Sequence, residues 1–169
     1  DKVIATHLVY DGFPVCVQLK GGVWDPKKTV VNIIMEALRV GASIIGIEST
    51  GYQQSLCFWM ETFLRKLNLS WITVVELHTR NKTKQSRISD YIDELQAGNC
   101  GIANSPRVIF EYFANNYKLN SSENRDDYLD APAYQKQVLT EHREHLVPAT
   151  GRYRTLDSLP PVEDIDIGV

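Results

Sequence analysis

Two β-rich runs near the start of the chain, residues 2–10 and 13–20, are separated only by Asp11-Gly12. An Asp-Gly pair between two such runs is one of the strongest short-range hairpin signals, because both turn residues must adopt positive φ. Gly21-Gly22 follows the second run and ends it. The sequence therefore predicts an antiparallel hairpin.

The next segments alternate between helical and strand patterns. Asp25-Pro26 predicts a helix start, with Asp25 as N-cap, and Gly41 predicts its end. An apolar run at 43–48 is typical of a buried strand, and a helix over 54–66 and a strand over 71–77 follow. This order indicates a mixed α/β sheet flanked by helices.

The second half is more helical. A helix running to Leu95, a tight turn at 98–101 and a helix from Ser105 to about Tyr117 are predicted, and a polar loop leads to an acidic cluster at 125–131. Beyond it, residues 147–169 are punctuated by prolines and end acidic, which predicts an extended tail or linker. We expect one domain over residues 1–146 and a tail over 147–169.

Composition limits the partners and the cellular compartment that we expect for this chain. The chain of 169 residues has a net charge of only -3, so any contact with nucleic acid must come from a local basic patch. Cys16, Cys57 and Cys100 are far apart and form no CxxC motif, which favours reduced cysteines in an intracellular protein. We see neither a signal peptide nor an apolar run of membrane-spanning length, and we expect a cytosolic protein without a membrane partner.

The acidic cluster is the first candidate site. Asp126, Asp127 and Asp130 can share one face of a helical turn, where their charges repel unless a cation lies between them. A hard divalent ion with oxygen ligands would relieve that repulsion. The alternative is that Asp126 or Asp127 only caps a helix. Pro132 requires a helix that begins near Asp130 or is kinked there, so the aspartates lie at a helix start in either case.

Glu48 is the second candidate, because it ends a predicted buried strand, where sites gather in α/β sheets. A buried carboxylate needs a partner or a metal ion, although Glu48 could instead face solvent in a loop.

The third candidate is a basic loop that runs into a helix. Its positively charged side chains are interleaved with small polar residues, a pattern that suits contact with the phosphates of DNA. Alternatively, the loop is only a solvated connection without a function. The charged residues are Arg80, Lys82, Lys84 and Arg87. We interpret His142 and His145 as surface histidines.

These motifs, in this order and spacing, resemble the nuclease domain of tailed-phage large terminases, from Ile44-Ile-Gly-Ile-Glu48 through Lys84-Gln-Ser-Arg87 to Arg125-Asp-Asp-Tyr-Leu-Asp130-Ala. The resemblance spans about residues 2–145. It implies an RNase H-like fold, a five-stranded mixed sheet flanked by helices. It also implies a metal-dependent endonuclease that cuts double-stranded DNA during genome packaging, in the cytoplasm of the infected host cell.

By this resemblance, Glu48, Asp126 and Asp127 are catalytic and hold two Mg²⁺ or Mn²⁺ ions, with Asp130 supporting the metal site. The implied partners are the terminase ATPase domain, the small terminase subunit and the portal. No GxxxxGK[ST] motif occurs, so the ATP-driven motor is not part of this chain.

The family's first aspartate, on the opening central strand, has no match here. Asp1, Asp11 and Asp25 all fall in predicted turns or caps. We therefore expect the opening strand, with its Asp, to lie upstream of residue 1. Two rival functions follow: a RuvC-type junction resolvase, which shares the fold and the Asp-x-x-Asp-Ala pattern, and a nuclease-dead RNase H-like module that only binds DNA or a partner.

Overall fold

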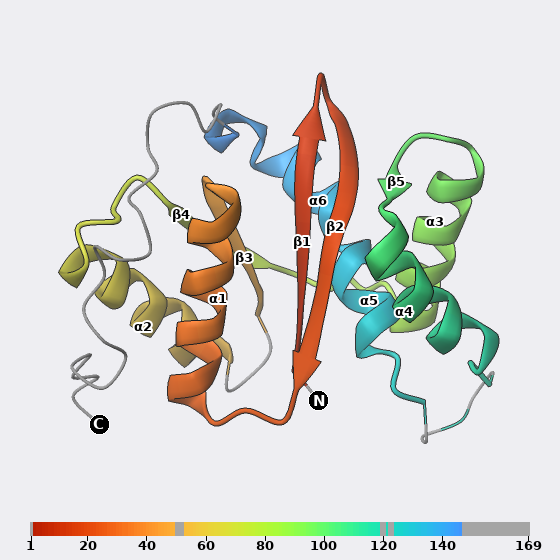
Figure 1. Cartoon of the computed structure of the whole chain (residues 1–169), viewed down its shortest axis with the longest axis horizontal. Coiled ribbons are helices and arrows are strands. Elements are labelled where there is room, and N and C mark those ends of the chain that lie inside the picture. Colours follow the sequence, from red (N-terminus) through yellow and green to blue (C-terminus); the bar gives the residue numbers. More distant parts are fainter. Residues whose placement is uncertain (1, 50–52, 119–120, 122–123, 147–169) are drawn as a thin grey trace. The chain divides into compact units, whose positions relative to one another are not determined.

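The computed structural model describes residues 2–49, 53–118, 121 and 124–146. The chain forms two compact units (Figure 1), and each is described by itself. Unit 1 consists of Asp1–Val23 and Thr79–Lys136, and unit 2 consists of Trp24–His78 and Gln137–Val169. The tail predicted for residues 147–169 lies outside the described residues, as does Asp1.

The predicted hairpin is confirmed and begins the sheet of unit 1. Strand β1, Lys2–Tyr10, pairs antiparallel with β2, Phe13–Gly22. Asp11 and Gly12 turn the chain with φ of 48° and 82°, the positive values that a two-residue hairpin turn requires. A short strand β5, Gly101–Ile102, pairs parallel with β2 and makes the sheet mixed, in the order β1-β2-β5.

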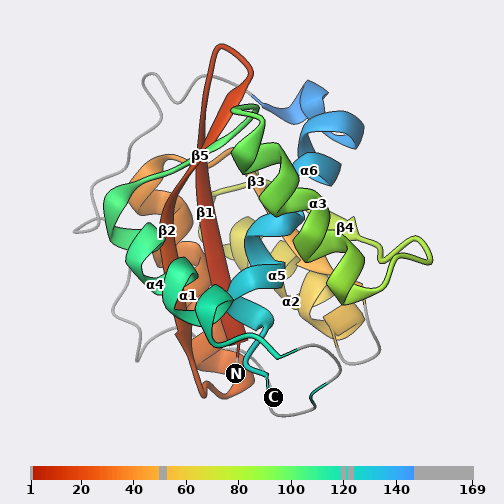
Figure 2. The same cartoon turned by 90° about the vertical axis from the view of Figure 1, so that its right-hand side faces the viewer.

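Three helices complete unit 1: α3, Lys84–Gln96; α4, Asn104–Asn115; and α5, Asp127–Ala133. Helix α5 contacts both β1 and α3, and α4 contacts β2 (Figure 2). Their apolar side chains form one core with the sheet, which contains Cys16, Leu19, Ile88, Tyr91, Cys100, Ile102, Phe110 and Leu129.

A close approach between β2 and α5 fixes the position of α5. The ring of Tyr128 stacks on that of Phe113, with 4.3 Å between centroids and 7° between planes. Tyr128 also lies against Gly21, where an added Cβ would be 2.2 Å from the tyrosine hydroxyl oxygen. Only glycine leaves room for the ring at this position of β2.

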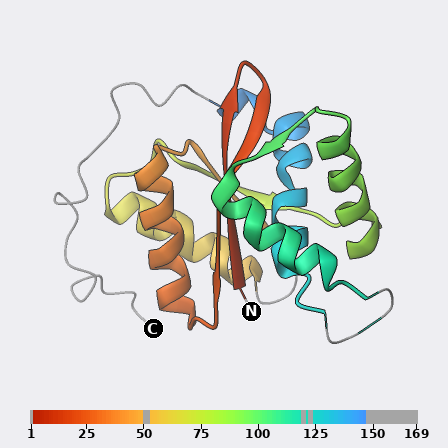
Figure 3. The same cartoon turned by 45° about the vertical axis from the view of Figure 1, so that its right-hand side comes forward.

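Unit 2 contains the predicted helix–strand–helix–strand series. Helix α1 is Pro26–Val40, β3 is Ile44–Glu48, α2 is Gln53–Lys66 and β4 is Thr73–Leu77. Strands β3 and β4 are parallel, in register from Ile44↔Thr73 to Glu48↔Leu77. Helix α1 contacts α2 (Figure 3), and the core between helices and strands includes Val30, Ile34, Ile45, Ile47, Met60, Phe63 and Leu69.

The predicted start and end of α1 are confirmed. The Asp25 carboxylate accepts a hydrogen bond from the backbone N–H of Lys28 at 2.7 Å, as an N-cap does. Gly41 ends the helix in the left-handed conformation, with φ of 65°. Asp11 and Asp25 thus lie in a turn and a cap, as predicted.

The chain is a mixed α/β structure with a mixed sheet and flanking helices. Its described strands form two sheets, β1-β2-β5 and β3-β4, where one five-stranded sheet was expected. Strand β5 was not predicted, because two residues beside a glycine-rich turn carry no strand pattern. No described helix is long and apolar enough to cross a membrane.

Candidate functional site

The acidic cluster lies at the start of α5, as predicted. Asp126 is the N-cap residue, and its backbone carbonyl accepts hydrogen bonds from the N–H groups of Leu129, at 2.9 Å, and Asp130, at 2.8 Å. Its side chain makes no capping hydrogen bond. Asp126 therefore caps the helix through its backbone alone, and its carboxylate bonds Lys84 instead.

That carboxylate and the next one meet a single cation. Lys84 Nζ lies 2.7 Å from Asp126 Oδ1 and 2.8 Å from Asp127 Oδ1. The three side chains are partly covered, with 35% of Lys84, 25% of Asp126 and 38% of Asp127 exposed. Two carboxylates this close need a positive charge between them, and here the lysine ammonium supplies it.

Lys84 is held in place by the start of its own helix. It is the first residue of α3, whose N-cap is Thr83; the Thr83 side chain accepts a hydrogen bond from the Ser86 N–H at 3.1 Å. Burial disfavours the charged form of Lys84, but the hydrogen bonds and charges of Asp126 and Asp127 outweigh that effect. The pKa of Lys84 is therefore raised above its ordinary value, and the ammonium stays charged at neutral pH.

Asp130 has a different partner. Arg87 Nε donates to Asp130 Oδ1 at 2.9 Å and Arg87 Nη2 donates to Asp130 Oδ2 at 2.7 Å, with both side chains almost fully buried. Arg87 Nη1 also donates to the Lys82 carbonyl at 3.1 Å, and the guanidinium lies 4.8 Å from the centre of the Tyr134 ring. This buried pair ties α3 to α5.

The basic loop thus contains cations in different environments. Arg80 and Lys82 are exposed, and Lys82 Nζ pairs with Asp90 at 2.6 Å in a surface ion pair. Lys84 is partly covered and Arg87 is buried. Arg80 and Lys82 lie at the surface, where a phosphate can approach them, whereas Arg87 would first have to leave Asp130.

Glu48 lies in unit 2, where it ends β3 as predicted and is half-buried. The chain beyond it is anchored to β4, because the Ser49 N–H donates to the Leu77 carbonyl at 2.7 Å and Ser49 Oγ bonds Glu76 Oε2 at 3.0 Å. Asp126, Asp127 and Asp130 belong to unit 1. The structure thus brings the aspartates together with Lys84 and Arg87 in unit 1, whereas Glu48 belongs to unit 2.

The two aspartates at Lys84 could hold a hard divalent ion, because both present a carboxylate oxygen to one point. Such an ion would compete directly with the ammonium. A second cluster of potential ligands, His142, Glu144 and His145, was missed by the sequence analysis. The signal that could have found it is the glutamate between the two histidines.

Comparisons with protein-family models, with curated proteins and with solved structures each found no match to this chain.

Proposed function

We propose that this chain is the nuclease part of a metal-dependent endonuclease that cuts double-stranded DNA, with an RNase H-like fold and a role in phage genome packaging. The observation that carries the proposal is the convergence of Asp126 and Asp127 on one cation position. The order of hairpin, helix, strand, helix and parallel strand agrees with the fold that the resemblance implies.

In this proposal Asp126 and Asp127 ligate Mg²⁺ or Mn²⁺ together with Glu48 and an aspartate on a central strand. Bound ions would supply charge stabilisation at the phosphate and a more acidic water. Arg80 and Lys82, which are exposed, would contact the DNA backbone. Asp130 would support the site by fixing α5 against Arg87. The ATPase domain, small subunit and portal of a terminase are the partners proposed with it.

Mn²⁺ binding, followed by electron paramagnetic resonance of the free ion, tests the metal site. Wild-type protein should take up Mn²⁺, and Asp127→Asn should take up at least tenfold less at the same concentration, because an amide is a poorer ligand than a carboxylate. Asp93→Asn is a matched control, since Asp93 is an exposed aspartate on α3 outside the cluster. Equal uptake by wild type and Asp127→Asn would refute the assignment.

Cleavage of supercoiled plasmid in Mn²⁺ tests the activity itself. Wild-type protein should nick plasmid DNA. Glu48→Gln and Asp127→Asn should abolish nicking, whereas Asp93→Asn should not. Nicking by Glu48→Gln at the wild-type rate would remove Glu48 from the site.

The Lys84 ion pairs also favour a second function, a nuclease-dead module that only binds DNA or a packaging partner. An ammonium bonded to both aspartates satisfies them without any metal. The two functions differ in one measurement. If the protein binds duplex DNA but takes up no Mn²⁺ even as Lys84→Ala, which removes the competing cation, the binding module is the correct assignment.

A further inference from the structure

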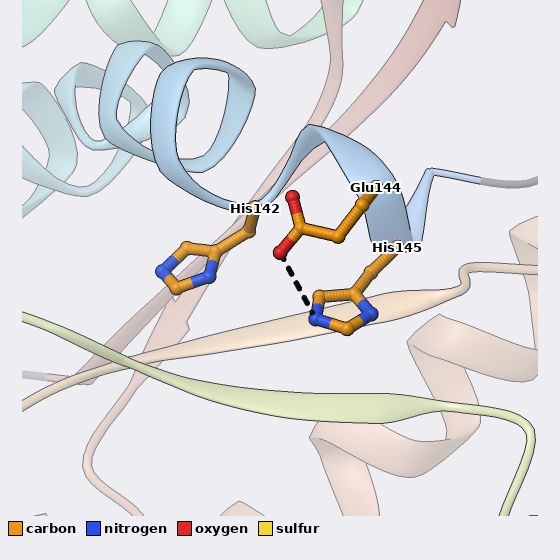
Figure 4. A group of neighbouring side chains, drawn as sticks. All are labelled: His142, Glu144 and His145. Atoms are coloured by element: carbon orange, nitrogen blue, oxygen red, sulfur yellow. Dashed lines mark ion pairs between the residues drawn. The ribbon is translucent and has the colours of Figure 1, made fainter.

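The segment that follows α6, Gln135–Glu141, brings together three side chains with metal-binding groups: His142, Glu144 and His145 (Figure 4). A single 3₁₀ turn, η1, covers Arg143–His145. The His145 N–H donates to the His142 carbonyl at 3.0 Å, which closes the turn. Residues three apart nearly eclipse each other in a 3₁₀ turn, so both histidines lie on the same side.

The ligand atoms of these residues are close enough to share one ion. One nitrogen or oxygen from each lies within 4.8 Å of the others, and His145 Nε2 is 3.3 Å from Glu144 Oε1. Tetrahedral zinc with bonds of about 2.1 Å places its ligand atoms about 3.4 Å apart. The Glu144–His145 pair already has that spacing. The other ligand atoms are at most 4.8 Å apart, which exceeds the zinc spacing by about 1.4 Å.

The side chains of Glu144 and His145 can move to close that difference, because both are partly exposed. Glu144 is 65% exposed and His145 is 39% exposed. The His142 Nε2 atom is enclosed and has no hydrogen-bond partner within the described part of the chain. A bound ion is one way to satisfy a buried polar atom that has no hydrogen-bond partner. The two rings are nearly parallel, with 24° between their planes and 6.5 Å between centroids.

We propose that His142, Glu144 and His145 form a binding site for a divalent ion of the zinc class. Two imidazole nitrogens and one carboxylate oxygen are a donor set that suits Zn²⁺, whereas Mg²⁺ prefers oxygen ligands alone. Three protein ligands leave a coordination position for water or an outside ligand. The ligands and the metal differ from those of the proposed nuclease site, so the two proposals stand independently.

The site is local in sequence and in structure. All three ligands lie within four consecutive residues of unit 2 and are arranged by one turn. The cysteines, which would otherwise compete for zinc, are all buried, Cys16 and Cys100 in the core of unit 1 and Cys57 in the core of unit 2. Burial raises the pKa of Cys16 to about 12 and that of Cys57 to about 11, so their thiols resist the deprotonation that zinc binding needs.

The alternative is a simple ion pair between Glu144 and His145, and pH separates the two. An ion pair needs a protonated histidine and strengthens as the pH falls. A metal site needs unprotonated imidazoles and weakens as the pH falls. Zinc binding by this cluster should therefore weaken on acidification, whereas the ion pair should strengthen.

Calorimetric titration of the full chain with ZnCl₂ is the test. Wild-type protein should bind one ion. His142→Gln, Glu144→Gln and His145→Gln should each weaken binding by about tenfold or more, because even the loss of a residue that only supports a ligand has an effect of about that size. His78→Gln is the matched control, because His78 is an exposed histidine of the same unit outside the cluster. It should bind like wild type. Circular dichroism would verify that the variants stay folded.

Co²⁺ offers a second readout, since tetrahedral Co²⁺ absorbs strongly in the visible range. Wild type and His78→Gln should develop this absorption and Glu144→Gln should not. The proposal is overturned if wild type binds no zinc, if the three cluster variants bind as tightly as wild type, or if blocking the thiols abolishes binding. None of these results would affect Mn²⁺ uptake at Asp126 and Asp127, which tests the nuclease proposal separately.

Discussion

The guanidinium of Arg87 and the carboxylate of Asp130 form a two-point ion pair inside unit 1, with Nε 2.9 Å from Oδ1 and Nη2 2.7 Å from Oδ2. Parallel hydrogen bonds between a planar cation and a planar anion give the pair a fixed geometry as well as charge compensation. The pair joins the first turns of α3 and α5, the two helices that also present Lys84, Asp126 and Asp127.

Breaking this pair should cost much of the stability of the protein. Asp130→Asn leaves the Arg87 charge buried without its counter-charge, and we expect a loss of about 3 kcal/mol or more in the free energy of unfolding. Urea unfolding measures it. Replacing both partners, as Arg87→Met with Asp130→Leu, should recover most of the loss, because no buried charge remains. If Asp130→Asn were as stable as the surface control Asp93→Asn, the Arg87–Asp130 pair would contribute little to stability.

The contact between Gly21 and Tyr128 gives a second prediction. Gly21→Ala places a methyl group where the tyrosine ring lies, and the ring cannot easily move because it stacks on Phe113. We expect a destabilisation of about 1–3 kcal/mol, as for other overpacked sites. In a double-mutant cycle, Gly21→Ala should cost clearly less in a Tyr128→Ala background. Additive effects would mean that the two residues do not interact.

Acid should destabilise the protein partly through His7. Burial lowers the pKa of His7 to about 4 from the ordinary 6.5. The folded state therefore resists protonation while the unfolded state accepts a proton. The contribution of neutral His7 is fully present above pH 6.5 and is lost progressively as the pH falls toward 4, by up to about 3 kcal/mol.

His7→Leu isolates this effect from the titration of carboxylates. Urea unfolding of both proteins between about pH 7.5 and 4.5 should show a smaller loss of stability in the variant than in wild type. Identical pH dependence in the two proteins would exclude His7 as the source.

DNA binding, if it follows the proposed function, should depend on salt through the exposed cations of the basic loop. Arg80→Ala and Lys82→Ala should each reduce the slope of log Kd against log salt concentration by about 1, without changing sequence preference. Lys27→Ala, an exposed lysine of unit 2, is the control. If the loop variants and this control give the wild-type slope, the loop is only a solvated connection. Fluorescence anisotropy at several salt concentrations provides the measurement.

The features predicted correctly are those that neighbouring residues determine. Asp11-Gly12 requires positive φ at both positions, Asp25 reaches an N–H three residues ahead, and Gly41 accepts the left-handed conformation. Hydrogen-bond geometry and steric limits within a few residues are sufficient for each, so the hairpin and α1 could be predicted from sequence alone.

The partners of the acidic cluster could not be predicted, because they lie far away in sequence. Lys84 and Asp126 are separated by 42 positions, and no local pattern shows that an ammonium will meet a helix cap. Arg87 looked like its neighbours in the basic loop, and only the packing of α3 against α5 buries it. Whether Glu48 joins the aspartates in one metal site stays a prediction.

The division of the chain into units has a consequence for the order of folding during synthesis. The helices and strands of unit 2 between Trp24 and His78 are contiguous in sequence, so their core can form as soon as they leave the ribosome. The hairpin is made before these elements, but its core partners in α3, α4 and α5 are made after them: Leu19 must wait for Phe110 and Leu129. Until then its apolar face stays exposed, which makes the nascent hairpin the natural place for chaperones to bind.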